Sequence, residues 1–148
     1  LRDILYYKPS NTRTNLAAAF EYANLILKKR SIIFVLSDFA DKDFMDALAI
    51  LARRHDVVAL QVLDEAEQQL PNAGILNLYD PETGFSMYVN SSDPFLRRRY
   101  KSQFDAQQDK LDKELKRAKV DHLCFCASDE VSRILREFFQ KRKRMRYA

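Results

Sequence analysis

Glycine is scarce in this sequence, which contains only Gly74 and Gly84 among its 148 residues. Phosphate-binding loops need glycine at the turn from a strand into the following helix, where the backbone approaches the phosphate closely. Neither glycine lies at a predicted turn of that kind. We therefore expect no phosphate-binding loop of either common type and no nucleotide hydrolysis.

Cysteine and long apolar runs are also scarce. Cys124 and Cys126 stand two residues apart, too close along a strand to form a disulfide with each other, and no third cysteine exists to pair with either. No apolar run approaches the roughly 20 residues that a membrane-spanning helix needs. The segment from Leu1 to Ser10 lacks the basic start and apolar core of a signal peptide. These absences predict a protein of the reducing cytoplasm.

The composition is that of a folded globular chain, with 47% hydrophobic and 31% charged residues. A length of 148 residues suits one domain with one core, so we predict a single domain over residues 1–148. Much of the formal net charge of +4 comes from Lys141 to Arg146. Such a segment is typical of a solvated helix end, and the charge predicts no broad nucleic-acid-binding face.

Apolar residues recur with helical spacing in four segments and form short, unbroken runs in three others. The helical segments are residues 16–30, 44–54, 94–119 and 131–146, and the runs are Ser31 to Asp38, Asp56 to Asp64 and His122 to Ala127. An unbroken apolar run is typical of a strand that is covered on both faces, as in a parallel sheet. We therefore predict an α/β fold with buried parallel strands joined by crossover helices.

The pattern changes between Ile75 and Asn90, where apolar and polar residues alternate after a turn at Asp80 to Gly84. Strict alternation is typical of a strand with one buried face. Pro81 presets the turn and Gly84 can adopt a positive φ, so this segment is a predicted β-hairpin.

Each predicted buried strand ends at or near a carboxylate, namely Asp38, Asp64 and Asp129. The carboxyl ends of parallel strands share one edge of the sheet, where α/β proteins bind ligands. Oxygen ligands of this kind suit Mg²⁺, so a shared cation site is one interpretation. Capping of a helix or loop is the alternative, and it is favoured for Asp129. It is less favoured for Asp38, because Asp41 and Asp43 are better placed to cap the following helix.

Thr12 and Thr14 precede the helix that begins at Leu16, so either hydroxyl could cap that helix or face a cation. Taken alone, Thr14 fits the capping role better.

His122, Cys124 and Cys126 alternate on one face of the last predicted strand and could supply three ligands to zinc. A strand filled with small apolar side chains explains the two cysteines equally well, and we favour that interpretation.

Five short segments follow one another along the chain: residues 14–20 (TNLAAAF), 36–39 (LSDF), 54–57 (RHDV), 63–67 (LDEAE) and 80–84 (DPETG). Together they resemble the bacterial family called domain of unknown function 58. The resemblance implies a von Willebrand factor A-like fold, which is a Rossmann-type three-layer α/β sandwich. No Asp-x-Ser-x-Ser motif occurs in the sequence. The resemblance therefore implies that residues 1–148 form the C-terminal portion of such a domain.

The same resemblance implies a site and a partner. Domains of the A type build a metal-ion-dependent adhesion site from an Asp-x-Ser-x-Ser motif, a threonine in a later loop and an aspartate after a later strand. Thr14 and Asp38 match the last two of these, which implies weak Mg²⁺ binding by this chain. Genes for MoxR-type AAA+ ATPases commonly accompany the family, which implies such an ATPase as the protein partner.

We therefore predict a non-enzymatic protein-interaction module that binds neither nucleic acid nor membrane. The alternative is a metal-dependent phosphoesterase or nuclease that uses Asp38, Asp64 and Asp129 as a carboxylate cluster. Without the first strands of the domain, the strand from Ser31 to Asp38 would expose an unpaired apolar edge. We expect a homodimer, an exchanged element or a helix to cover that edge.

Overall fold

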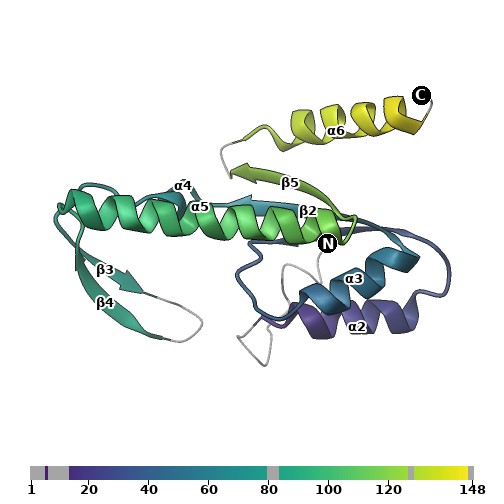
Figure 1. Cartoon of the computed structure of the whole chain (residues 1–148), viewed down its shortest axis with the longest axis horizontal. Helices are drawn as coiled ribbons and strands as arrows, with labels where there is room; N and C mark the ends of the chain where they lie inside the picture. Colours follow the sequence, from purple (N-terminus) through teal and green to yellow (C-terminus); the bar gives the residue numbers. More distant parts are fainter. Residues whose placement is uncertain (1–5, 7–13, 80–83, 127–128, 147–148) are drawn as a thin grey trace.

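The computed structural model describes residues 6, 14–79, 84–126 and 129–146. Ten elements follow one another along these residues (Figure 1): α2 (Leu16–Ile26), β1 (Ile32–Ser37), α3 (Met45–Arg54), β2 (Asp56–Leu63), α4 (Glu65–Gln68), β3 (Ile75–Tyr79), β4 (Ser86–Asn90), α5 (Pro94–Arg117), β5 (Asp121–Cys126) and α6 (Val131–Arg146). The predicted α/β fold class is confirmed. Within the described ranges, no helix is both long and apolar enough to cross a membrane.

The main sheet has three parallel strands in the order β1-β2-β5. Ile33 of β1 pairs with Val57 of β2, and Leu60 of β2 pairs with Leu123 of β5. The central strand β2 is buried along most of its length. Because the strands are parallel, all three end at the same edge, which we call the carboxyl edge of the sheet. The parallel strands that the sequence predicted are confirmed.

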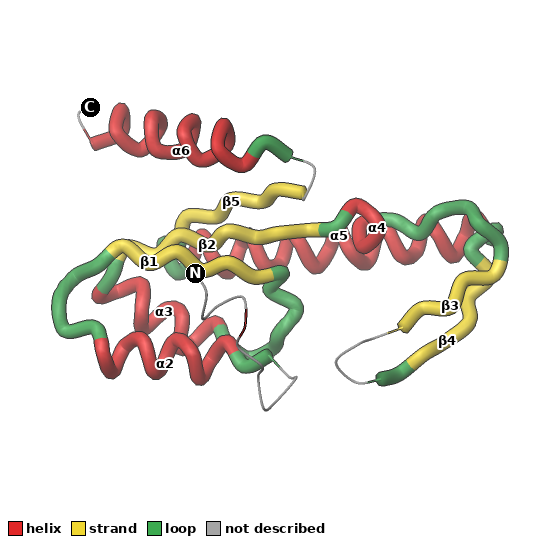
Figure 2. The backbone as a smooth tube through the Cα atoms, turned by 180° about the vertical axis from the view of Figure 1, so that it is seen from behind, coloured by secondary structure: helices red, strands yellow, loops and turns green. Residues whose placement is uncertain are grey.

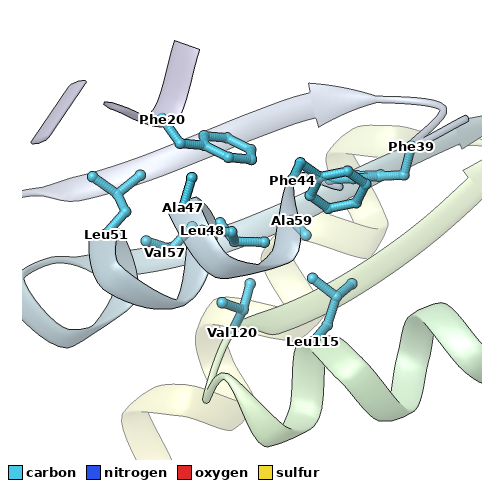
Figure 3. Close-up of a cluster of buried hydrophobic side chains, with 10 residues drawn as sticks. All are labelled: Phe20, Phe39, Phe44, Ala47, Leu48, Leu51, Val57, Ala59, Leu115 and Val120. Atoms are coloured by element: carbon cyan, nitrogen blue, oxygen red, sulfur yellow. The ribbon is translucent and has the colours of Figure 1, made fainter. Parts of the chain in front are cut away.

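Helices cover both faces of this sheet, which gives three layers (Figure 2). On one face, α2, α3 and the end of α5 pack against β1 and β2 around the main core (Figure 3). The rings of Phe20 and Phe39 both lie against Phe44, with centroids 6.1 Å and 5.8 Å from it. The buried members of this core are Phe20, Phe39, Phe44, Ala47, Leu48, Leu51, Val57, Ala59, Leu115 and Val120.

The other face carries α6, which packs against Val58, Leu60 and Phe125 of β2 and β5. Its contacting side chains are Val131, Ile134, Leu135 and Phe138. This helix therefore covers the sheet over its second and third strands.

The prediction that the strand from Ser31 to Asp38 is covered on both faces is wrong. Ile32, Phe34 and Leu36 point away from the main core and remain 57%, 44% and 66% exposed. The helix α6 reaches this strand through the ring of Phe139, whose centroid lies 6.0 Å from that of Phe34. One face of β1 therefore stays open, and Val62 of β2, which is 36% exposed, extends this apolar surface. We call these four residues the β1 patch.

The antiparallel hairpin β3–β4 lies apart from the main sheet, beyond the first turns of α5 (Figure 1). Leu76 pairs with Val89 and Leu78 with Met87, so the predicted hairpin is confirmed. Gly84 adopts a φ of +73°, as its place in the turn required. The turn residues 80–83 lie outside the described part of the chain.

The long helix α5 begins as the sequence predicted. Asp93 is its N-cap, and the carboxylate accepts a hydrogen bond of 2.8 Å from the N–H of Phe95. Pro94 occupies the first helical position, where its missing N–H costs nothing.

Candidate functional site

A cleft opens at the carboxyl edge of the sheet, between the loop that follows β1 and the helix α5. It encloses about 630 Å³. Acidic, basic and amide side chains line it, together with apolar groups such as Phe39, Phe104 and Leu111. Its polar and charged lining includes Asp38, Asp41, Gln61, Glu67, Tyr100 and Lys110.

Asp38 stands at the rim of this cleft, directly after β1. Its Oδ1 accepts hydrogen bonds from the N–H of Ala40 at 3.1 Å and from the Ser37 hydroxyl at 3.3 Å. The residue is exposed. The carboxylate therefore shapes its own loop and also faces solvent, which leaves room for a ligand beside it.

Asp41 joins the Asp38 loop to the start of α2. Its Oδ2 accepts a hydrogen bond of 2.7 Å from the N–H of Leu16, and its Oδ1 accepts one of 2.7 Å from the N–H of Lys42. The prediction that Asp41 or Asp43 caps α3 is wrong, because Phe44 is the N-cap there and makes no side-chain cap bond. The bond from Leu16 to Asp41 could not be predicted from residue types, because the two residues lie 25 positions apart.

The N-cap of α2 is Asn15, whose Oδ1 accepts a hydrogen bond of 2.9 Å from the N–H of Ala18. The capping role predicted for Thr14 is therefore wrong. Thr14 is exposed and lies two residues before Leu16, which donates to Asp41. The structure thus brings the segments that contain Thr14 and Asp38 to one end of the domain, although Thr14 does not line the cleft. Thr12 lies outside the described residues.

The other two carboxylates of the predicted cluster have local roles. Asp64 caps the short helix α4 by accepting a 2.8 Å hydrogen bond from the N–H of Ala66. Asp129 accepts a 2.7 Å hydrogen bond from the N–H of Cys126, the last residue of β5. Among the described residues, no three His, Cys, Asp or Glu side chains come together as a metal-binding group. The geometry gives the carboxylate-cluster interpretation no support.

The floor of the cleft contains Gln61, a residue that the sequence interpretation missed. Gln61 is fully buried in β2 and bonds to the Asp38 carbonyl oxygen at 3.0 Å. Its Oε1 lies 3.1 Å from Nε2 of His122, whose Nδ1 lies 3.2 Å from Oδ1 of Asp112. The ring of His122 therefore has two partners already. A glutamine within an otherwise apolar strand was the signal that could have revealed this contact.

Tyr100 of α5 lies on the opposite wall of the cleft. Its hydroxyl donates a 2.9 Å hydrogen bond to the backbone carbonyl of Glu67. Burial, and secondly the negative charge of Glu67, raise the pKa of Tyr100 above 10.0. The hydroxyl therefore stays protonated at neutral pH and ties α5 to the segment after β2.

His55 lies at the amino end of the sheet, away from the cleft. Its Nδ1 accepts a 3.3 Å hydrogen bond from the N–H of Ser31, at the amino end of β1. It cannot serve as a base for Ser37, which ends the same strand.

The family model described as "Protein of unknown function DUF58" matches residues 1–110 of this chain. The chain belongs to the DUF58 family. This DUF58 chain is 34% identical over 90 residues to the uncharacterized protein Mb1516 of Mycobacterium bovis and to Rv1480 of Mycobacterium tuberculosis. The match covers 60% of the chain and 28% of each of these relatives.

A third relative of the DUF58 chain, the uncharacterized protein MAV169 of Mycobacterium avium, is 34% identical over 77 residues. That match covers 51% of the chain and 46% of the relative. The DUF58 chain thus spans less than half the length of these relatives. No solved structure matches it significantly.

Proposed function

We propose that this DUF58 chain is part of a non-enzymatic, von Willebrand factor A-like interaction module, and that its partner docks at the cleft beside Asp38. The observation that carries the proposal is the loop of residues 38–44. It leaves the carboxyl edge of a parallel sheet and forms one wall of an open cleft of about 630 Å³ opposite α5. Ligands of open α/β sheets bind at this edge. The lining combines acidic, basic and apolar side chains, as protein-binding surfaces do.

We further propose that Mg²⁺ bridges the module and its partner, with oxygen ligands from Asp38 and Thr14. Carboxylate and hydroxyl oxygens match what Mg²⁺ prefers. One oxygen of Asp38 already accepts two hydrogen bonds within its loop, which orients the carboxylate. Two protein ligands make a weak site, so water and groups outside residues 1–148 complete it in this proposal.

The partner in this proposal is a MoxR-type AAA+ ATPase, because the DUF58 family resemblance implies one. We place the interaction in the cytoplasm, which the free thiols of Cys124 and Cys126 support. The relatives are much longer than the matched segment, so the proposal concerns the full-length protein that contains this chain.

Co-purification of the full-length protein with the ATPase tests the proposal. Asp38→Ala should reduce recovery of the ATPase at least about tenfold, and removal of Mg²⁺ by EDTA should have a similar effect. Asp105→Ala is the matched control, because it removes an exposed carboxylate of α5 outside the cleft lining. Unchanged recovery with Asp38→Ala would refute the proposed site.

A further inference from the structure

Gln61 is a polar residue in the apolar interior of the sheet. Its side chain is 0% exposed, and it shares one face of β2 with Val57 and Ala59 of the main core. A buried amide costs free energy unless both its oxygen and its nitrogen are hydrogen-bonded. At this position the amide therefore makes contacts that an aliphatic side chain could not supply.

The two ends of the Gln61 amide reach toward the two neighbouring strands. Its Nε2 donates to the carbonyl oxygen of Asp38 at 3.0 Å, and its Oε1 lies 3.1 Å from Nε2 of His122. The other ring nitrogen of His122 lies 3.2 Å from Oδ1 of Asp112. A chain of polar contacts thus runs from Asp112 of α5 through His122 of β5 and Gln61 of β2 to the residue that follows β1.

The group at one end fixes the orientation of this amide. The carbonyl oxygen of Asp38 can only accept a hydrogen bond, so the amide nitrogen of Gln61 must face it. The amide oxygen then faces the ring of His122. Turning the amide over would place two oxygens together and would remove the bond to Asp38. Gln61 and His122 therefore hold the Asp38 carbonyl in one place.

The backbone beside Asp38 requires such support. Phe39 has a φ of +58°, a left-handed conformation that residues other than glycine rarely adopt and that persists only when the surroundings enforce it. The N–H of Phe39 donates to the Ser37 hydroxyl at 3.0 Å, and its ring packs on Phe44. These contacts and the Gln61 bond together fix the turn that carries the loop toward the cleft.

We propose that Gln61 is a positioning residue for Asp38, and that His122 in turn orients Gln61. Gln61 touches the backbone of Asp38 rather than its carboxylate, so it acts by fixing where that carboxylate stands. The effect on partner binding rests on the proposed function, whereas the effect of Gln61 on the conformation of the loop after β1 does not.

Amide hydrogen exchange in the 148-residue chain tests the hold on the loop. Gln61→Leu keeps the side chain buried but removes both hydrogen bonds. Val57→Ala is the control, because it creates a void on the same face of β2 without touching Asp38. Compared at equal global stability, the amides of Phe39 and Ala40 should exchange about tenfold faster in Gln61→Leu than in Val57→Ala. Equal exchange at these two amides would overturn the proposal.

His122→Leu is the second variant and keeps the proposal testable if Gln61→Leu does not fold. The His122 side chain is 13% exposed, so its replacement leaves no closed cavity. This variant should speed exchange at Phe39 and Ala40 about threefold. No change in exchange at these amides would overturn the orienting role. The double variant provides a second check: if its increase in exchange equals the two single increases added together, the orienting role is also overturned.

Partner binding separates the two proposals. If Asp38→Ala leaves ATPase binding unchanged while Gln61→Leu still frees the loop, the proposed function fails and the positioning role stands. If Asp38→Ala abolishes binding while Gln61→Leu leaves both the loop and the binding intact, the positioning role fails.

Discussion

At the scale of single residues, aspartates in similar sequence settings do different things. Asp64 and Asp93 cap the helices that follow them. Asp41 also precedes a helix, yet it accepts the N–H of Leu16 and ties the loop after β1 to the start of α2. The Asp38 carboxylate accepts a hydrogen bond within its own loop and remains exposed at the rim of the cleft. Asp38 is the residue of this group that is both exposed and part of the cleft lining.

The capping role of Asp93 predicts different free energies of unfolding for two variants of this residue. Asp93→Ala should lower the free energy of unfolding by about 1 kcal/mol, because the N–H of Phe95 loses its acceptor. Asp93→Asn should have almost no effect, since asparagine caps equally well. Urea unfolding followed by circular dichroism measures both. Equal losses in the two variants would mean that charge rather than capping stabilises the start of α5.

Cys124 should react slowly for a surface thiol. Burial by neighbouring atoms, then the nearby Cys126 and Asp129, raise the pKa of Cys124 above 9.0. The thiolate is the reactive form, so a raised pKa leaves less of it at any given pH. The rate of alkylation by iodoacetamide, followed at this residue by mass spectrometry, should rise with pH to a midpoint above that of a cysteine in a short unstructured peptide. A midpoint at or below that of the peptide would contradict this assignment.

The roles of residues could be predicted where a partner lies close in sequence. Asp93 precedes Pro94 and a helical stripe, so its role as N-cap followed from the sequence. The role of Asp41 and the bond from Gln61 to Asp38 did not, because their partners lie 25 and 23 residues away. The bond from Gln61 depends on the register of β1 against β2, and the bond of Asp41 depends on how α2 packs beside the loop after β1. Residue types alone specify neither.

At the scale of elements, α6 is held to the sheet by an apolar stripe and by one arginine. Arg142 bonds to Asp56 of β2 and lies 3.1 Å from Asp121 of β5. Its guanidinium also lies over the ring of Phe138, 5.3 Å from the centroid. The arginine thus fastens the end of α6 to the first residues of two strands.

Arg142→Leu should lower the free energy of unfolding by about 2 kcal/mol, because a partly buried, charged hydrogen-bond donor is lost. Arg133→Leu on the same helix removes an exposed pair with Glu137 and should cost less than about 0.5 kcal/mol. Urea unfolding of both variants provides the comparison. A loss as small for Arg142 as for Arg133 would show that the apolar stripe alone holds α6.

Element types could be predicted because periodicity is local. The alternation between Ile75 and Asn90 gave the hairpin, and the unbroken apolar runs gave the parallel strands. The same runs could not reveal that one face of β1 stays open, because Ile32, Phe34 and Leu36 would form the same apolar run if a helix covered them. Which face α6 covers is decided by packing over β2 and β5.

At the scale of the whole molecule, the β1 patch stands out as apolar sheet surface that the described helices leave exposed. Both faces of a parallel sheet are normally covered, yet Ile32, Phe34 and Leu36 are exposed. Among the described residues, β1 pairs with β2 alone, so its other edge also offers backbone groups. Such an edge favours pairing with another chain.

We therefore expect the 148-residue chain to form a homodimer through β1. Light scattering after size exclusion should give twice the mass of one chain at micromolar concentration. Phe34→Lys should shift the population to monomer, because a charge on the patch opposes pairing. Tyr88→Lys is the control, since it places the same charge on an exposed residue of the hairpin. A chain that is monomeric throughout this range would rule out the dimer.

The most direct test of the central claim is a hydrogen-exchange footprint of the full-length protein bound to a MoxR-type ATPase with Mg²⁺. The cleft proposal predicts protection of residues 38–44 and of the α5 segment from Tyr100 to Leu111, which together form its walls. This protection should disappear in Asp38→Ala. Protection confined to the hairpin, α6 or the β1 patch, with the cleft unchanged, would contradict the proposal that Asp38 stands at the binding surface.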